Sequence, residues 1–430
     1  MMPEQQNAGW SNTPPGKSRS APGSPIQLAV FFISFAILVS RRPDAILNAQ
    51  FYAEDGARWF ADAYHFGWRC LLLPDSGYLQ TASRLVGLLA LAFPFAMAPL
   101  VMNVCALVMQ ILPVNIFLSS TWRAIPFYLR ISCCLLYLAL PNSFEVHANT
   151  TNMQWHLALI GLLILLGKYE ESLVWRGFAL SALTLAVLDG AAGMLLVVVA
   201  VPLLVKRREM FLKEAVAVLA CGSLLQTAFL FFSHSRRPAP NGAGLVRLVG
   251  ILGGQVFFSS ILGVRTFIRL FFDQSRYLLL AEVVALCLGI GIVAYACCRA
   301  PLELRLFLLY AAVALTLALI HPVATYGGTA EQWQQMQTPG VGNRYYFFPM
   351  LAFLSALIWS VTTPAATTGV RYIAFAVLLL LPVGIWRDWK YKPFEDLQFK
   401  ERAAEFDRAV PGTTVVIPIN PNWQLVLTKH

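Results

Sequence analysis

Long apolar segments recur from residue 26 to residue 386, separated by short polar connections. A helix of about 20 mostly apolar residues crosses the hydrocarbon core of a bilayer. Soluble domains contain about 25% charged residues, whereas this chain of 430 residues is 13% charged and 58% hydrophobic. Its mean hydropathy is +0.63. The sequence therefore predicts an all-α polytopic membrane protein and excludes a soluble globular domain.

Clusters of basic residues follow several of these segments. They are Arg123/Arg130, Lys168/Arg176, Lys206–Arg208 with Lys213, Arg299/Arg305 and Arg371. Because cytosolic loops are enriched in Lys and Arg, all five clusters are placed in the cytosol, with two crossings between neighbouring clusters. This predicts about 11 transmembrane helices, a cytosolic N-terminus and an external C-terminus. The excess of 32 basic over 22 acidic residues fits basic cytosolic loops and does not imply nucleic acid.

The predicted crossings leave three segments to explain. The crossings are 26–39, 100–117, 131–140, 155–167, 178–188, 194–205, 211–232, 277–298, 306–320, 346–359 and 372–385. Segment 84–93 is predicted to lie at the outer surface, because a crossing there would turn the downstream basic loops outward. Segment Leu188–Gly193, with two glycines and an acid, is predicted to turn a tight hairpin. Segment 245–272 is amphipathic and is predicted to lie along or dip into the outer leaflet.

Polar segments divide the chain further. Residues 1–25 are rich in Pro, Gly and Ser and are predicted to be a disordered cytosolic tail. Within the transmembrane domain, 26–386, three outer loops are longer than a connection needs: 41–84, 233–276 and 321–345. An outer C-terminal segment, 387–430, combines a helical pattern with a β-like run. The eight cysteines lack CxxC and Cys/His ligand spacing, so neither a zinc site nor a disulfide framework is supported.

An acidic pair, Glu54 and Asp55, opens an amphipathic helical pattern in the first outer loop. A carboxylate at a membrane surface can act as general base toward a sugar hydroxyl, and such a pair also suits a divalent cation. The alternative is structural, since acids are favoured at helix N-termini and Glu54 can pair with Arg58. Metal ligands beyond this pair remain unknown, and no cofactor is assigned.

The motifs FYAEDG, FADAY, GYLQ, NMQW and RYYFFP, spread over residues 48–360, resemble those of bacterial members of the GT-C superfamily of integral membrane glycosyltransferases. The resemblance implies many spans with surface helices in the first outer loop. It also implies inverting transfer of a sugar from a polyprenyl-phosphate donor to a glycan or lipid acceptor. Asp55, or its neighbour Glu54, would be the base. The protein would lie in the inner membrane with its active site on the periplasmic side.

Arginines on the outer side suit a donor phosphate, because the guanidinium donates bidentate hydrogen bonds. Arg344 opens RYYFFP and is predicted to contact that phosphate, with Tyr345 adding a hydroxyl or a stacking face. The loop 233–276 carries Arg236, Arg237, Arg247, Arg265, Arg269 and Arg276. Of these, Arg265 and Arg269 are the predicted substrate contacts. Binding to anionic headgroups or anchoring at the interface are the alternatives.

Five further residues complete the predicted substrate site. Asn152 and Gln154 are predicted to bind sugar hydroxyls, and Trp155 to stack on a sugar ring. For Trp155 taken alone, a place in the aromatic belt at the membrane interface is the favoured alternative. Tyr78 of GYLQ is included with the substrate-binding residues. Asp189 is an acid at membrane depth, predicted to share the outer cavity with the acidic pair, or else to cap the short helix that follows it.

Three other classes of membrane protein remain as alternatives. A transporter or flippase would be expected to show broken helices in two repeated halves, but the LDGAAG break has no counterpart elsewhere. An O-antigen polymerase or ligase would rely on outer Arg and His residues rather than on an acidic pair. A structural subunit would need none of these charges.

Overall fold

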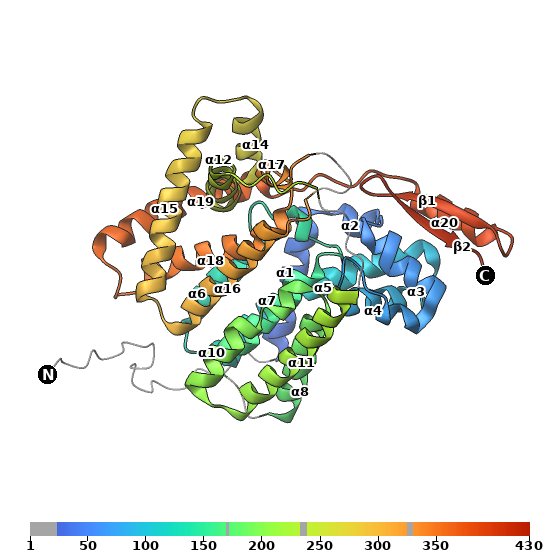
Figure 1. Ribbon diagram of the computed structural model, residues 1–430, viewed down its shortest axis with the longest axis horizontal. Helices are drawn as coiled ribbons and strands as arrows, with labels where there is room; N and C mark the ends of the chain where they lie inside the picture. Colours follow the sequence, from blue (N-terminus) through green and yellow to red (C-terminus); the bar gives the residue numbers. More distant parts are fainter. Residues whose placement is uncertain (1–23, 169–171, 233–238, 325–329) are drawn as a thin grey trace.

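The computed structural model describes residues 24–168, 172–232, 239–324 and 330–430, and these are mostly helical (Figure 1). Of the predicted tail 1–25, all but Ser24 and Pro25 lie outside the described residues, and those two begin the first helix. One two-stranded antiparallel sheet lies near the C-terminus.

Every predicted crossing corresponds to a helix. These are α1 Ser24–Arg41, α5 Ala98–Leu118, α6 Phe127–Leu138, α7 Met153–Leu166, α8 Leu173–Leu188, α10 Val197–Arg207, α11 Met210–Phe232, α15 Leu278–Arg299, α16 Leu302–Ile320, α18 Asn343–Thr362 and α19 Thr368–Asp388. Within the described ranges, seven helices are long and apolar enough to cross a membrane: six predicted crossings (α5, α11, α15, α16, α18 and α19) and Leu245–Leu262. Shorter apolar helices are found in α1, α6, α7 and α8, and in Thr81–Ala90. The prediction of an all-α polytopic membrane protein is confirmed.

The remaining elements are short. In chain order they are α2 Asp44–Leu47, η1 Asp55–Phe60, α3 Ala61–Phe66, η2 Gly67–Leu72, α4 Thr81–Ala90, η3 Phe95–Met97, η4 Ser120–Trp122, η5 Phe144–Val146, α9 Ala191–Met194, α12 Leu245–Val249, η6 Gly250–Phe258, α13 Ser259–Leu262, α14 Val264–Phe272, α17 Gln332–Gln337, α20 Phe399–Arg408, β1 Thr414–Ile419 and β2 Trp423–Thr428. Of these, η1 and η6 are π-helical, with wider turns than an α-helix.

Hydrogen bonds tie several helix ends together at one end of the bundle, which we call the site face. Arg41, at the end of α1, donates to the carbonyls of Leu138 and Leu140 at 2.7 and 2.9 Å. Asn343, at the start of α18, donates to the carbonyl of Asn142 at 3.1 Å. The ends of α1, α6 and α18 therefore meet at the site face.

The basic clusters gather at the opposite ends of the helices. Lys168, after α7, donates its amide to the carbonyl of Thr121 at 3.0 Å. Arg207, at the end of α10, pairs with Glu303 at the start of α16 at 2.6 Å. This alternation is what the positive-inside pattern requires. That the basic end faces the cytosol, and that the C-terminus is external, stay predictions.

The apolar helix Leu245–Leu262 is built from α12, η6 and α13, and its contacts hold it at the site face. The side chain of Asn142 donates to the carbonyl of Gln255, in the middle of this helix, at 3.0 Å. The Gln255 amide donates to the carbonyl of Thr338 at 2.6 Å. Just beyond its end, Val264 donates its amide to Asp388 at 2.6 Å. Both its middle and its end thus lie at the site face. That it lies along the outer leaflet stays a prediction, and it is also long and apolar enough to cross a membrane.

Two of the segments singled out in the sequence form short helices. Helix α4 covers most of 84–93 and packs against η1, α3 and α5. A Cβ on Gly87 would lie 2.4 Å from the carbonyl oxygen of Trp59, so only glycine permits this close packing. At LDGAAG, α8 ends before Asp189, and Gly190 takes a φ of +117° before α9. The chain therefore breaks there into separate helices.

The C-terminal segment packs on the first loop, beside η1 and α3 (Figure 1). Phe399 of α20 is buried against the rings of Phe51 and Phe95, at centroid distances of 5.1 and 5.2 Å. The amide of Ala53 donates to the carbonyl of Asn420 at 2.6 Å. The C-terminal segment is therefore part of the structure that positions the acidic pair.

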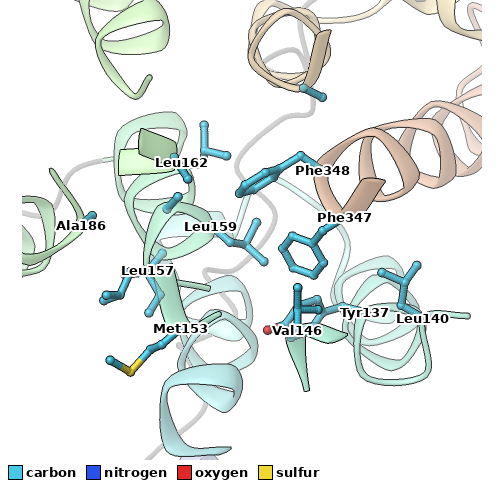
Figure 2. Packing of buried hydrophobic residues seen from close by; sticks show 14 of the residues in the cluster. Tyr137, Leu140, Val146, Met153, Leu157, Leu159, Leu162, Ala186, Phe347 and Phe348 are labelled. Carbon is cyan, nitrogen blue, oxygen red and sulfur yellow. The ribbon is translucent and has the colours of Figure 1, made fainter. Parts of the chain in front are cut away.

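Apolar packing between α6, α7 and α18 forms the centre of the bundle (Figure 2). The rings of Tyr137 and Phe347 lie 6.3 Å apart, and Phe347 contacts Phe348 at 5.2 Å. The Tyr137 hydroxyl donates to the carbonyl of Gln110 at 2.7 Å, so its buried polar atom is paired. This core packs against the connection between α6 and α7, because Val146 of that connection belongs to the same cluster.

Candidate functional site

The connection 141–152 is almost entirely buried at the site face, although only η5 gives it regular structure. A buried loop must find partners for its backbone groups. Asn149 and Asn152 provide them, donating to the carbonyl of Glu145 at 2.8 and 2.9 Å. Asn152, predicted to bind sugar hydroxyls, therefore points inward and holds this connection in place.

Asp55 is 1% exposed, and its carboxylate accepts four hydrogen bonds from two residues of that connection. The amide and hydroxyl of Thr150 donate at 3.0 and 2.7 Å, and those of Thr151 at 2.7 and 2.6 Å. Burial raises the pKa of Asp55, and these hydrogen bonds oppose the rise. Asp55 thus joins the start of η1 to the connection 141–152.

Glu54, directly before η1, is only partly buried. In the part of the chain that the structure describes, no other residue's side chain is found donating to its carboxylate. Burial raises the pKa of Glu54, and the charges of Asp75 and Asp55 raise it further. Its own amide and the guanidinium of Arg344 act in the opposite direction. Glu54 is therefore an accessible carboxylate with an increased affinity for a proton.

Arg344 is held at the mouth of α18 by several contacts. Its amide donates to one carboxylate oxygen of Glu145 at 3.0 Å, and its guanidinium pairs with the other. It also donates to the carbonyl of Val323 at 2.5 Å and lies 4.7 Å from the centre of the Tyr345 ring. These contacts fix the position of the guanidinium while 22% of the side chain stays exposed.

Arg42, just after α1, is 4% exposed and forms no ion pair within the described ranges. Its one side-chain hydrogen bond goes to the carbonyl of His147 at 3.4 Å, and its Nε has no partner. The rings of Phe394 and Tyr391 lie 4.3 and 5.5 Å from the guanidinium carbon. Burial lowers the pKa of Arg42, and the nearby carboxylate of Asp44 is the main influence that opposes this.

Tyr52 lies close enough to these charged groups for each of them to influence its pKa. Burial is the main cause that raises its pKa. The carboxylates of Glu145 and Glu54 raise it as well, whereas the guanidinium groups of Arg42 and Arg344 lower it. Two acids and two arginines from three segments of the chain, the first loop, the connection 141–152 and the start of α18, therefore lie near one phenol at the site face.

Asp189 caps α4, the helix of the first loop, rather than the short helix that follows it. Its Oδ1 accepts from the amides of Ala82 and Ser83 at 2.8 and 3.2 Å. Its Oδ2 is buried without a partner. A Cβ on Gly190 would lie 2.4 Å from the amide oxygen of Gln154, which is only partly buried. Asp189 and Gln154 are thus neighbours around Gly190.

Trp155 and Tyr345 also lie together, with their rings edge to face at 6.2 Å. The Tyr345 hydroxyl accepts from the amide of Val323 at 3.2 Å. The indole Nε1 of Trp155 is buried without a partner. The structure therefore places Tyr345 beside Arg344, and Trp155 against Tyr345.

Other predicted residues lie apart from this cluster. Tyr78 exchanges backbone hydrogen bonds with Asp75 at 3.0 and 3.1 Å, which positions that acid near Glu54. Arg265 and Arg269 are exposed on α14, and the Arg265 guanidinium donates to the carbonyl of Lys390. No contact found among the described residues joins either arginine to Glu54 or Arg344. Two further arginines of that loop, 236 and 237, lie outside the described residues.

Sequence reasoning missed Arg42, the role of Glu145, and the pair Thr150–Thr151. Arg42 carried a signal, because a basic pair at the outer end of the first span departs from the positive-inside bias. Glu145 and Arg344 are 199 residues apart, so no local pattern joins them. In the described part of the chain, no three His, Cys, Asp or Glu side chains are grouped to hold a metal ion.

Comparisons with known proteins add little. No protein-family model matches the chain, and no curated protein matches it. Among solved structures, the chain is similar to the crystal structure of ArnT from Cupriavidus metallidurans in the apo state. The identity is 14%, the match covers 82% of this chain and 84% of that one, and the TM-score is 0.36. A likeness at this level carries no argument, so the proposals below rest on the chain's own residues.

Proposed function

We propose that this chain is a GT-C-like membrane glycosyltransferase. It moves a sugar from a polyprenyl-phosphate donor to a glycan or lipid acceptor of the cell envelope, at the site face, which lies on the periplasmic side of the inner membrane. The observation that carries this proposal is the partly exposed carboxylate of Glu54 within reach of the charge of Arg344, beside Tyr52, which also lies within reach of Arg42, at the end of an apolar bundle. The carboxylate can act as a general base, and the arginines can bind the donor phosphate. The apolar bundle can accommodate the lipid tail of the donor.

The reaction is a single displacement. The acceptor hydroxyl oxygen attacks C1 of the donor sugar, and a new C1–O bond forms. The bond between C1 and the phosphate oxygen breaks, and its electron pair leaves with the polyprenyl phosphate. Glu54 takes the hydroxyl proton as the new bond forms. Attack from the face opposite the phosphate inverts the configuration at C1.

The two acids take different roles in this proposal. A general base must come within hydrogen-bond reach of the proton it removes. All four described hydrogen bonds of the Asp55 carboxylate come from Thr150 and Thr151. Glu54 is partly exposed, and its raised pKa increases its driving force as a base. We therefore assign the base to Glu54, in place of the Asp55 favoured by the sequence, and assign Asp55 to positioning.

Arg42 and Arg344 are proposed to bind the donor phosphate. A phosphate beside Arg42 would accept a hydrogen bond from its Nε, which has no partner in the structure. Arg344 is already oriented by Glu145 and Tyr345. Its side chain is partly exposed at the site face, where a ligand would meet it.

Replacing Arg344 by Lys is expected to weaken donor binding by about 10-fold or more, because a charge-assisted contact to phosphate contributes about 1.5–3 kcal/mol and lysine loses the bidentate fork. Binding of a fluorescent polyprenyl-phosphate sugar to the purified protein in nanodiscs measures this. Arg269→Lys, on the exposed face of α14, is the control and should bind as wild type. An unchanged affinity in Arg344→Lys would assign Arg344 to membrane anchoring.

The activity itself can be tested in cells. A deletion strain should lack one sugar from an envelope glycan or lipid, as measured by mass spectrometry. Wild-type protein should restore that sugar and Glu54→Gln should not. If the strain instead accumulates complete lipid-linked glycans on the cytosolic side, the protein is a transporter and the proposal fails.

A further inference from the structure

A groove with a cavity volume of about 370 Å³ lies between the first loop and the C-terminal hairpin. Its volume is within the range of small-ligand sites, about 300–1,000 Å³. The helical side contributes Arg58, Asp62 and His65, and the strand side contributes Trp423, Gln424 and Val426. Figure 1 shows the hairpin beside α3. The groove therefore joins two segments of the chain that are far apart in sequence.

The strand side offers backbone groups as well as side chains. The amide of Thr428 donates to Nε2 of His65 at 3.2 Å, so this amide points away from β1 and toward α3. In an antiparallel pair, alternate residues direct their N–H and C=O groups the same way. Gln424 and Val426 alternate with Thr428 along β2, so their backbone groups point in the same direction as those of Thr428. Pro418, which pairs with Gln424 in the sheet, has no N–H to donate to it. Their backbone donors and acceptors consequently face the groove.

Trp423 gives the groove an aromatic face. Its side chain is partly exposed, and its ring stacks on no other aromatic ring within the described residues. Polar groups of both signs lie beside it, since Arg58 pairs with Asp75 at 3.5 Å and Asp62 pairs with Arg84 at 2.6 Å. An aromatic face surrounded by hydrogen-bonding groups suits a sugar, which has apolar ring faces and polar edges.

The groove leads to the proposed base. Arg58 lines the groove and lies about one π-helical turn after Glu54, because η1 begins immediately after Glu54. Asp75, the partner of Arg58, is also the charge that most raises the pKa of Glu54. A molecule lying in the groove would thus extend toward the Glu54 carboxylate.

We infer that this groove binds the carbohydrate part of the acceptor, with one sugar on Trp423 and the reacting hydroxyl directed to Glu54. The inference rests on the proposed function, and it names the acceptor class as a glycan rather than a simple lipid alcohol. It also assigns a function to the C-terminal hairpin, whose strand β2 provides half of the groove.

Oligosaccharides released by mild acid from the envelope glycolipids of the producing cells serve as the probe. Their binding to the purified full-length protein is measured by calorimetry without donor, and their KM is measured in the transfer assay. Trp423→Ala should weaken binding and raise this KM by about tenfold, the upper range for an aromatic contact. The donor KM and the kcat at saturating acceptor should stay unchanged.

Matched variants separate binding from folding. Val416→Ala alters the residue opposite Val426, with 49% exposure and no place in the groove, and should behave as wild type. Trp423→Phe keeps an aromatic face and should bind nearly as well. Gln424→Ala, on the exposed face of β2, provides a second weakening variant if Trp423→Ala lowers the melting temperature.

The outcomes distinguish the groove from the proposed function. Suppose that Trp423→Ala and Gln424→Ala bind the oligosaccharides as wild type does while Glu54→Gln abolishes transfer. The groove is then not the carbohydrate site, and the proposed transferase activity is retained. If binding depends on Trp423 but the wild type transfers no sugar, the groove is a carbohydrate site and the proposed transferase activity is wrong. If the oligosaccharides bind neither the wild type nor the variants, the assignment of the groove as a carbohydrate site is wrong.

Discussion

Glu54→Gln is expected to lower the transfer rate by about 10²–10⁴-fold, the usual contribution of a general base. Glutamine keeps the size of the side chain but cannot accept the hydroxyl proton. Because the Glu54 carboxylate accepts no side-chain hydrogen bond among the described residues, the variant should fold and bind donor normally. Single-turnover transfer from a polyprenyl-phosphate sugar to the envelope acceptor, with donor binding measured in parallel, tests this.

The pH profile gives an independent check on the same residue. A base works in its ionised form, so wild-type activity should fall as the pH drops through the pKa of Glu54. Burial and the neighbouring acids raise that pKa, which places the fall above the ordinary glutamate range. This acidic limb should be absent from the residual activity of Glu54→Gln. Near-normal turnover by this variant would remove Glu54 as the base and return the role to Asp55.

Asp55→Ala is expected to destabilise the protein by about 3 kcal/mol or more, because it leaves buried donors of Thr150 and Thr151 without an acceptor. Each unpaired group costs about 1–3 kcal/mol. Asp55→Asn should cost less, since its remaining carbonyl oxygen still accepts part of the network. The melting temperature of the purified protein in detergent measures both variants.

The control for Asp55 is Asp273→Ala. Asp273 is exposed after α14, and surface substitutions of this kind usually change stability by less than about 0.5 kcal/mol. An Asp55→Ala protein as stable as this control would contradict the positioning role. If Asp55→Asn then folds normally and transfers no sugar, Asp55 itself is the base.

The sequence alone determined the helices. Burial in lipid requires each backbone polar group to be paired within its own segment, so the apolar runs had to become helices wherever they occurred. Each predicted crossing from 26–39 to 372–385 accordingly contains a helix. Local chemistry also located the acidic pair and Arg344, since charged residues at the ends of apolar segments stand out in composition.

Only the tertiary structure decided which of these residues share a site. The side chains of neighbouring residues point in different directions. The sequence therefore could not show that the Asp55 carboxylate accepts hydrogen bonds from Thr150 and Thr151 while the Glu54 carboxylate stays accessible. The partner of Arg344 comes from another connection of the bundle. Hydropathy reports how deeply a segment is buried, whereas the meeting of two side chains depends on how helices pack. That packing is set by contacts far apart in the chain, and it alone brings an acid, two arginines and the C-terminal hairpin to one face.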